Sequence, residues 1–286
     1  MRIGVNVPNF GPGTNPDSLA RWAKTVEGLG FDLLMLSDHV AITSDVAKQY
    51  PAPFYEPVTT LAWLAGITTR IKLGTTVLIA PYRHPLLVAR MAANLQQLSG
   101  GRLILGVGVG WAREEFEALG VPFERRGALT DEHLRTIRAA WKNDADYGCG
   151  QIPIWVGGNS DAAIHRAVRL GSPWHPLRFT MPWFRDAVDR LKNISAVLDQ
   201  PVPELAPRIY LRLAEKPIDD PDRRAGEGTI EQILQDIEEL RLAGAETVLL
   251  DPYHGDPNET LRPEVAWQAL ATVAAQRSQP TPTETE

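Results

Sequence analysis

The sequence Gly101-Arg102-Leu103-Ile104-Leu105-Gly106-Val107-Gly108-Val109-Gly110-Trp111 joins an apolar run to alternating glycines. The apolar run, at residues 103–107, shows no alternation of apolar and polar positions, which is typical of a strand buried on both faces of a parallel sheet. Glycines adopt backbone angles that other residues avoid, and they let a ligand approach the main chain closely. Since α/β enzymes bind ligands at the carboxyl ends of such strands, we expect a functional site at this glycine-rich end.

The glycines allow two other interpretations. A dinucleotide-binding fingerprint, G-x-G-x-x-G, requires a glycine where Trp111 stands, and no acidic strand end follows at the expected distance. The second alternative is that the glycines serve only close packing between strands. The position of the stretch at a strand end favours a ligand site over both.

Outward from this stretch, predicted strands and helices alternate along the whole chain. The strands are predicted at residues 3–7, 31–36, 71–79, 103–107, 152–156, 172–175, 208–213 and 247–250. The helices are predicted at residues 16–29, 57–69, 86–98, 114–119, 130–141, 161–170, 182–198, 229–243 and 262–275. Eight strand–helix units predict a single (β/α)8 TIM barrel of the α/β class over residues 1–276, rather than a doubly wound sheet. The polar segment 277–286 is predicted to be a disordered tail.

Composition limits the classes of function. The 286 residues are 44% hydrophobic and 22% charged, with a formal net charge of −6. This balance offers no basic face for nucleic acid or for an anionic membrane, so we expect neither as a partner. We also expect no signal peptide and no membrane span. The single cysteine, Cys149, excludes an intramolecular disulfide and favours a reducing cytoplasmic location.

The chemistry of a barrel of this kind lies at the strand ends. Polar residues and glycines at the predicted ends are Asn6, Asp38, His39, Thr75, Thr76, Gly108, Trp111, Gly157, Gly158, Asn159, Ser160, His175 and Asp251. Asp38-His39 pairs a carboxylate with the side chain that titrates nearest neutral pH, which favours acid–base chemistry; the alternative is a turn cap beside a passively packed histidine. No pair of histidines or cluster of carboxylates has metal-site spacing, and we expect no metal.

A second candidate is the turn 157–160, which opens a predicted helix. Free amides and the helix dipole favour an anion such as a phosphate there, although a tight strand-to-helix turn alone explains the glycines as well. Arg126, which follows Arg125, could supply a cationic partner.

Several motifs occur together in one order along the chain. They are Ser37-Asp38-His39-Val40, Leu73-Gly74-Thr75-Thr76-Val77-Leu78, Leu98-Ser99-Gly100-Gly101-Arg102, the glycine stretch to Trp111, Pro153-Ile154-Trp155-Val156-Gly157-Gly158-Asn159-Ser160 and Trp174-His175-Pro176. Over residues 1–276 the chain therefore resembles the bacterial luciferase-like monooxygenase family, most closely its branch that uses coenzyme F420.

The resemblance implies a cofactor site and a reaction. It implies a flavin or deazaflavin at the carboxyl face, against a bulge at Thr75-Thr76-Val77 that often contains a non-prolyl cis peptide. It implies catalytic roles for His39 and Asp38, and cofactor contacts from Asn6, Gly108, Gly110, Trp111, Arg126 and residues 157–160. The expected activity is hydride transfer between coenzyme F420 and a small organic substrate. The alternatives are an FMN-dependent monooxygenase and a catalytically impaired barrel that serves as a binding or structural subunit; a homodimer is compatible with all three.

The chain departs from the family pattern in three places. Trp111 stands where sugar-phosphate dehydrogenases of this group carry a glutamate, and Ser172-Pro173 replaces the usual Asp-Gly. The link between Trp141 and Ile152 is ten residues of mostly polar sequence, much shorter than the usual insertion. From this short link we predict an unusually open carboxyl face and a weakly held cofactor.

Overall fold

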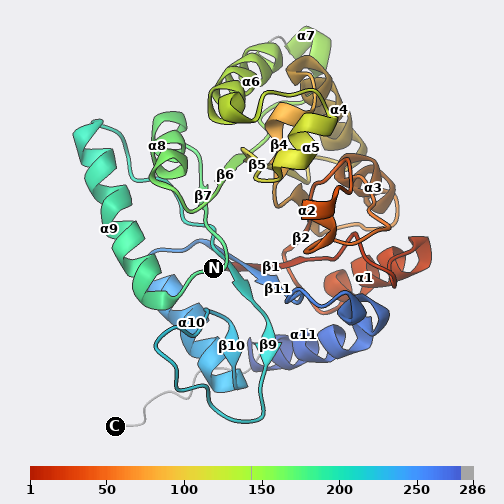
Figure 1. The fold of residues 1–286 in the computed structure, drawn as a ribbon, viewed down its shortest axis with the longest axis vertical. Helices are drawn as coiled ribbons and strands as arrows, with labels where there is room; N and C mark the ends of the chain where they lie inside the picture. The colour runs from red at the N-terminus through yellow and green to blue at the C-terminus, as the bar shows by residue number, and fades with distance from the viewer. Residues whose placement is uncertain (143, 278–286) are drawn as a thin grey trace.

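A computed structural model describes residues 1–142 and 144–277 of the protein and shows an α/β barrel (Figure 1). Its parallel strands are β1 (Arg2–Asn6), β2 (Leu33–Leu36), β3 (Lys72–Thr75), β4 (Leu78–Ile79), β5 (Leu103–Gly108), β6 (Ile154–Gly157), β7 (Trp174–His175), β8 (Arg208–Tyr210) and β11 (Thr247–Asp251). The order β7-β6-β5-β3-β2-β1-β11-β8 runs around the barrel, and β4 continues the line of β3 beside β5. Bridges Trp174↔Leu205 and Leu177↔Arg208 connect the two ends. The predicted eight-stranded barrel is confirmed.

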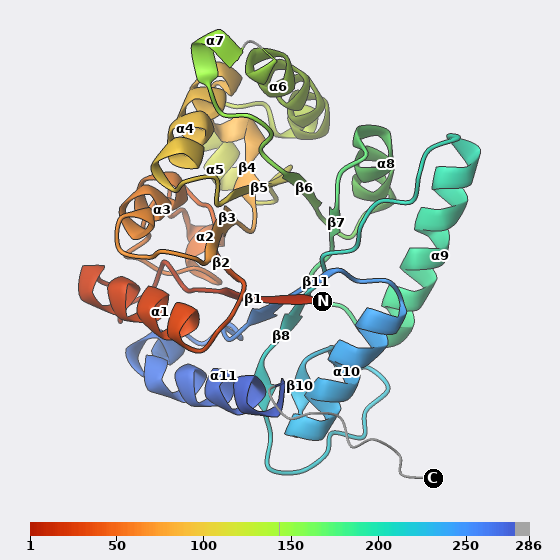
Figure 2. The same cartoon turned by 180° about the vertical axis from the view of Figure 1, so that it is seen from behind.

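Helices surround these strands in both views (Figures 1 and 2). The long ones are α1 (Pro16–Gly28), α3 (Pro57–Ala65), α4 (Pro85–Leu98), α6 (Arg126–Trp141), α8 (Asp161–Leu170), α9 (Met181–Val197), α10 (Ile230–Leu242) and α11 (Pro263–Arg277). Short elements lie in the connections: α2 (Ser44–Ala47), α5 (Arg113–Ala118), α7 (Asp144–Tyr147), the 3-10 turns η1 (Ala80–Tyr82), η2 (Phe123–Arg125) and η3 (Pro257–Leu261), and the pair β9 (Arg212–Leu213) and β10 (Glu227–Gly228).

Local sequence explains where the helices begin and which face they bury. In α1, the Asn15 side chain accepts from the Ser18 amide in a capping box, and Pro16 occupies the first turn. Leu19, Trp22, Ala23 and Val26 recur at helical spacing and are all buried against the barrel. The predicted start of α6 is four residues late, and α2 was not predicted. The predicted tail lies outside the described residues except for Arg277, which ends α11.

The predicted third strand is interrupted by a bulge. β3 ends at Thr75, the Thr76–Val77 peptide bond is cis, and β4 resumes at Leu78. The cis bond implied by the family resemblance is therefore present where it was expected.

The glycines of β5 and β6 make room for this bulge. A Cβ on Gly106 would lie 2.0 Å from the Thr75 carbonyl oxygen, and one on Gly108 would lie 2.4 Å from Val77 Cγ2. A Cβ on Gly157 would lie 2.6 Å from Val77 Cγ1. Close packing is thus one reason for these glycines, and it shapes the same strand ends at which a ligand site was predicted.

The short link between α6 and β6 lies at the amino ends of the strands. Its α7 packs against α4, where Arg90 Nη1 donates to the Asp146 carbonyl (2.5 Å) and Gln97 Nε2 donates to the Tyr147 carbonyl (2.8 Å). A helix that follows a barrel strand returns the chain to the amino end before the next strand begins. A link at this end does not reach the carboxyl face, so its length gives no reason to expect an open site. The open carboxyl face and the weakly held cofactor stay predictions.

Candidate active site

A cavity of ≈ 220 Å³ opens at the carboxyl ends of the strands. It is lined by Ser37, Asp38, His39, Tyr50, Thr76, Val77, Ile79, Gly108, Val109, Gly110, Trp111, Gly157, Gly158, His175, Leu177 and Arg208. Of the other residues predicted for the site, Asn6, Thr75, Arg126, Asn159 and Ser160 do not line it. A larger groove of ≈ 600 Å³ runs along α11 and contains none of the predicted site residues. Most of the residues predicted for the site therefore line this one cavity.

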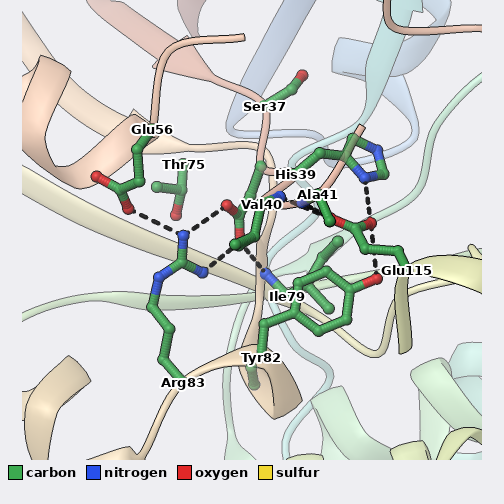
Figure 3. Close-up of polar contacts among 12 residues, drawn as sticks. Ser37, His39, Val40, Ala41, Glu56, Thr75, Ile79, Tyr82, Arg83 and Glu115 are labelled. Carbon is green, nitrogen blue, oxygen red and sulfur yellow. Dashed lines mark hydrogen bonds and ion pairs between the residues drawn. The ribbon is translucent and has the colours of Figure 1, made fainter. Parts of the chain in front are cut away.

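His39 is held in one orientation by Glu115 of α5 (Figure 3). His39 Nδ1 lies 2.6 Å from Glu115 Oε2, and both side chains are buried. Because a carboxylate oxygen accepts, Nδ1 is the donor nitrogen, and Nε2 is the ring nitrogen that Glu115 leaves free. No hydrogen bond from the described part of the chain involves Nε2, so this nitrogen is available to a ligand in the cavity.

Four donors converge on the Glu115 carboxylate. The Val40 and Ala41 amides donate to Oε1 at 2.6 and 3.0 Å, while the Tyr82 hydroxyl joins His39 at Oε2 at 2.9 Å. Burial raises the pKa of Glu115, but these hydrogen bonds, first that of His39, outweigh burial and hold the pKa below its ordinary value. Burial and the neighbouring Glu115 charge raise the pKa of Tyr82. Glu115 is therefore an ionised orienting group for His39.

We expect Glu115→Gln to remove a pH-dependent part of the stability. Because the folded-state pKa lies below the ordinary value of 4.5, the carboxylate contributes stability that is fully present above the unfolded pKa and is lost as the pH falls through the folded one. The difference in free energy of unfolding between wild type and variant should be largest near neutral pH and shrink below about pH 4.5. Urea denaturation across this range measures it, with the exposed Glu117→Gln of the same helix as control. A difference independent of pH would contradict the assignment.

Asp38 has a different environment from His39. Arg83 binds both of its carboxylate oxygens, at 2.7 and 2.8 Å, and the Ile79 amide donates to Oδ2 at 2.8 Å. Arg83 also contacts Glu56 at 2.9 Å (Figure 3). Since its oxygens are occupied, Asp38 is suited to fix the end of β2 against β4; its predicted catalytic role stays a prediction.

The buried ion pair of Arg208 and Asp251 contacts the bulge at Thr76. Arg208 Nη2 and Nε donate to Asp251 Oδ2 at 2.6 and 3.0 Å, and Arg208 Nη1 donates to the Thr76 carbonyl at 2.9 Å. Asn6, predicted to contact the cofactor, instead donates to Asp251 Oδ1 at 2.9 Å. Burial raises the pKa of Asp251, but the neighbouring guanidinium of Arg208 outweighs it, so this carboxylate stays ionised.

His175 completes this support as a neutral residue. Burial lowers its pKa to about 4, and the hydrogen bond from Nδ1 to the Ala206 carbonyl offsets only part of that effect. Nε2 is then an acceptor, which fits the Thr76 hydroxyl at 2.8 Å. Thr76 is thus fixed through both its carbonyl and its hydroxyl.

The turn after β6 is exposed at the mouth of the cavity. Gly158 has φ +123°, which favours glycine. Asn159 exchanges hydrogen bonds with the backbone of Leu177 at 2.8 and 2.9 Å, and Ser160 caps α8. Arg126 lies over the Phe123 ring, 3.9 Å from its centroid, and donates to the Phe123 carbonyl. Sequence-level reasoning grouped Arg126 with this turn, but its hydrogen bond is made within its own connection.

Aromatic rings form the wall around His39. Tyr50, Phe54 and Trp111 lie with their ring centroids 5.0, 5.6 and 5.7 Å from the imidazole. Trp111 is 43% exposed, so it stands at the opening rather than in the core. The site therefore places His39 beside an aromatic surface.

Sequence analysis missed Glu115, Arg83, Tyr50 and Arg208. Glu115 lies in the short helix α5, 76 residues beyond His39, and its local sequence gives no sign of that partner. The partners of Arg83 and Arg208 lie 45 and 43 residues away and have no local signal. Among the residues described, no group of three or more His, Cys, Asp or Glu side chains could hold a metal ion. Likewise, no helix in the described ranges is long and apolar enough to cross a membrane.

Comparison with known proteins gives consistent sequence matches. A family model described as luciferase-like monooxygenase matches residues 1–220. An uncharacterized protein of Mycobacterium tuberculosis is 33% identical over 181 residues, covering 54% of this chain and 63% of that protein. A phthiodiolone/phenolphthiodiolone dimycocerosates ketoreductase of the same organism is 33% identical over 167 residues, covering 51% of this chain and 43% of the relative. The match spans less than two thirds of either relative.

Solved structures share the fold. An F420-dependent secondary alcohol dehydrogenase in complex with an F420-acetone adduct aligns with a TM-score of 0.73 at 17% identity, covering 96% of this chain and 99% of that chain. The oxygenating constituent of 3,6-diketocamphane monooxygenase from Pseudomonas putida, in complex with FMN, aligns with a TM-score of 0.75 at 17% identity, covering 99% of each chain. At this identity the likeness concerns the barrel alone.

Proposed function

The chain belongs to the luciferase-like monooxygenase family, and from this premise we propose that it is an oxidoreductase that transfers a hydride between coenzyme F420 and a small organic alcohol or carbonyl compound. The observation that carries the proposal is the orientation of His39. Glu115 occupies Nδ1, so Nε2 is available at the cavity to exchange the proton that accompanies hydride transfer.

The cavity suits the ring system of such a cofactor. At ≈ 220 Å³ it is smaller than the ~300–1,000 Å³ of typical ligand pockets, so it would hold a ring rather than a whole cofactor. Val77, Gly108 and Val109 offer a flat apolar surface for the ring, which Cβ atoms at Gly108 and Gly157 would disturb by displacing Val77. The turn at Gly157 and Gly158 would receive the phosphate at the mouth. When bound, coenzyme F420 supplies a two-electron hydride donor and acceptor.

Residues of the chain would transfer the proton, fix the surface for the ring and limit the access of water. His39 holds or releases the proton at Nε2, and Glu115 stabilises the imidazolium that forms when Nε2 is protonated. Arg208 and His175 fix Thr76, and therefore the surface against which the ring would lie. Tyr50 and Trp111 limit the access of water to the reacting atoms.

The alternative is an FMN-dependent monooxygenase on the same barrel, since a structural neighbour binds FMN. The structural neighbour described as an F420-dependent secondary alcohol dehydrogenase supports the F420 assignment. The ketoreductase name supports the substrate class only, because it describes reduction of a carbonyl group. The catalytically impaired barrel was suggested by the missing acid at Trp111 and by the short link 142–151. The Glu115–His39 pair argues against it, since the site still holds a carboxylate against its histidine.

The cofactor assignment predicts selective fluorescence quenching. Trp111 lines the cavity, so a bound deazaflavin ring should quench tryptophan emission saturably as coenzyme F420 is titrated in. FMN at the same concentrations should quench less, and Trp111→Phe should remove most of the response without preventing binding. Saturable quenching by FMN alone would reverse the order of the two candidates.

We further propose a cytoplasmic location, which the single cysteine supports. A homodimer remains a prediction.

A further inference from the structure

Arg178 is a partly buried cation with no carboxylate partner among the described residues. Its Nε is buried without a hydrogen bond, and its two side-chain hydrogen bonds are long: Nη1 to Gln49 Oε1 at 3.5 Å and Nη2 to the Tyr50 hydroxyl at 3.3 Å. The guanidinium also lies 5.9 Å from the centroid of the Tyr50 ring and 5.7 Å from that of Tyr210. A guanidinium carries five N–H donors, so most of its capacity is unused.

Other shielded arginines are fully engaged. Arg83, Arg166, Arg208 and Arg223 each pair with an aspartate at 2.6 or 2.7 Å. Arg102, whose guanidinium also lacks a close carboxylate, donates instead to backbone and hydroxyl oxygens of Ala65, Thr68, Ile71 and Ser99 at 2.6–3.1 Å. Arg178 has no carboxylate partner among the described residues and only two long hydrogen bonds, although burying a charged group is favourable only when it is paired or well hydrogen-bonded.

Arg178 does not itself line the active-site cavity but lies next to residues that do. It directly follows Leu177 and contacts Tyr50, both of which line the cavity. Its φ of +53° is unusual for a residue other than glycine, and such backbone outliers are frequent at ligand sites. The Arg178 amide donates to the Arg208 carbonyl at 3.3 Å, which fixes its backbone to the end of β8.

The local charge balance is positive. Asp251 forms its ion pair with Arg208 and none with Arg178, so one carboxylate lies between two guanidinium groups. Burial lowers the pKa of Arg178, but the surrounding Tyr50, Asp251 and Tyr210 outweigh it, and the side chain stays cationic. The net charge of the chain is −6, so attraction for an anion at this point is local.

We propose that Arg178 binds an oxyanion, a carboxylate or phosphate group carried by the substrate. The substrate class would then be an anionic alcohol or carbonyl compound, with its charged group at Arg178 and its reacting carbon near His39. That the anion belongs to a substrate rests on the proposed function. The presence of an anion site at Arg178 does not depend on it.

The test begins with the cofactor-free protein and inorganic phosphate as the probe. Calorimetric titration should detect binding to the wild type, and Arg178→Gln should weaken it by about 10-fold to 100-fold, the usual effect of losing charged hydrogen bonds. Arg178→Gly is a second variant, since glycine suits the positive φ and keeps the backbone. Arg212→Gln, which removes an exposed arginine two residues beyond Tyr210, is the matched control and should bind phosphate normally. Equal phosphate affinity in all four proteins would overturn the proposal.

A second arm separates a substrate anion from the phosphate of the cofactor. The dissociation constant of coenzyme F420 should be the same for wild type and Arg178→Gln if the anion belongs to the substrate. A parallel loss of F420 and phosphate affinity would overturn the substrate assignment. A wild type that binds phosphate at Arg178 but does not bind F420 would support the anion site while refuting the proposed function.

Discussion

Replacing His39 with alanine should lower turnover by about 10²–10⁴-fold, the range expected when a positioned acid–base group is lost. The reason is geometric: Nε2 is the polar atom of the imidazole that is open to the cavity, because Nδ1 is committed to Glu115. Cofactor affinity should change much less, since the ring surface and the turn at Gly158 remain. Steady-state turnover and cofactor titration of the same preparation separate the two effects.

The control for this variant is His165→Ala. His165 is exposed on α8 and does not line the cavity, so its loss should leave turnover unchanged. If His39→Ala retained the turnover of this control, His39 would be a packing residue among Tyr50, Phe54 and Trp111.

Replacing Asp251 with alanine should destabilise the fold by about 3–5 kcal/mol, because it leaves the buried Arg208 guanidinium without its counter-charge. Both side chains are almost fully buried, at 3% and 1% exposure, so water cannot take the place of the carboxylate. Arg208 also holds the Thr76 carbonyl, and the variant should therefore lose cofactor affinity as well as stability. The free energy of unfolding in urea measures the first effect.

Asp161→Ala provides the matched comparison. Asp161 pairs with Arg190 at 3.2 Å, with the two side chains 66% and 39% exposed. An exposed pair of this kind contributes about 0–1 kcal/mol. Asp161→Ala should therefore lower the free energy of unfolding several-fold less than Asp251→Ala. Similar losses from both substitutions would contradict the importance assigned to the Arg208–Asp251 pair.

The barrel was predictable because its signals are local. The non-alternating run at 103–107, the capping residue Asn15 and the repeated strand–helix alternation each lie within a short window. His39 was predictable for the same reason, since it stands at the end of a recognisable strand. The length of the link 142–151 was wrongly related to the cover of the carboxyl face. The strand–helix alternation already places this link at the amino ends, because a helix-to-strand connection of a barrel lies there.

The partners within the site could not be predicted in the same way. Glu115 meets His39 across 76 residues, and Asn6 meets Asp251 across 245. Such pairs depend on barrel closure, which brings strand ends together without leaving a periodic signal in the sequence. Arg178 was not singled out because an arginine at the start of a loop is ordinary; only its missing partner and positive φ mark it.

Reduction and oxidation of coenzyme F420 by the purified protein test the central claim most directly. Small alcohols, including ones that carry a carboxylate or phosphate, are mixed with protein and oxidised F420 without oxygen, and the visible absorbance of the deazaflavin is followed. We expect alcohol-dependent loss of absorbance with wild type, little with His39→Ala, and recovery when the matching carbonyl compound is added. Oxygen consumption with reduced FMN, together with no change in F420 for any alcohol or carbonyl compound, would contradict it.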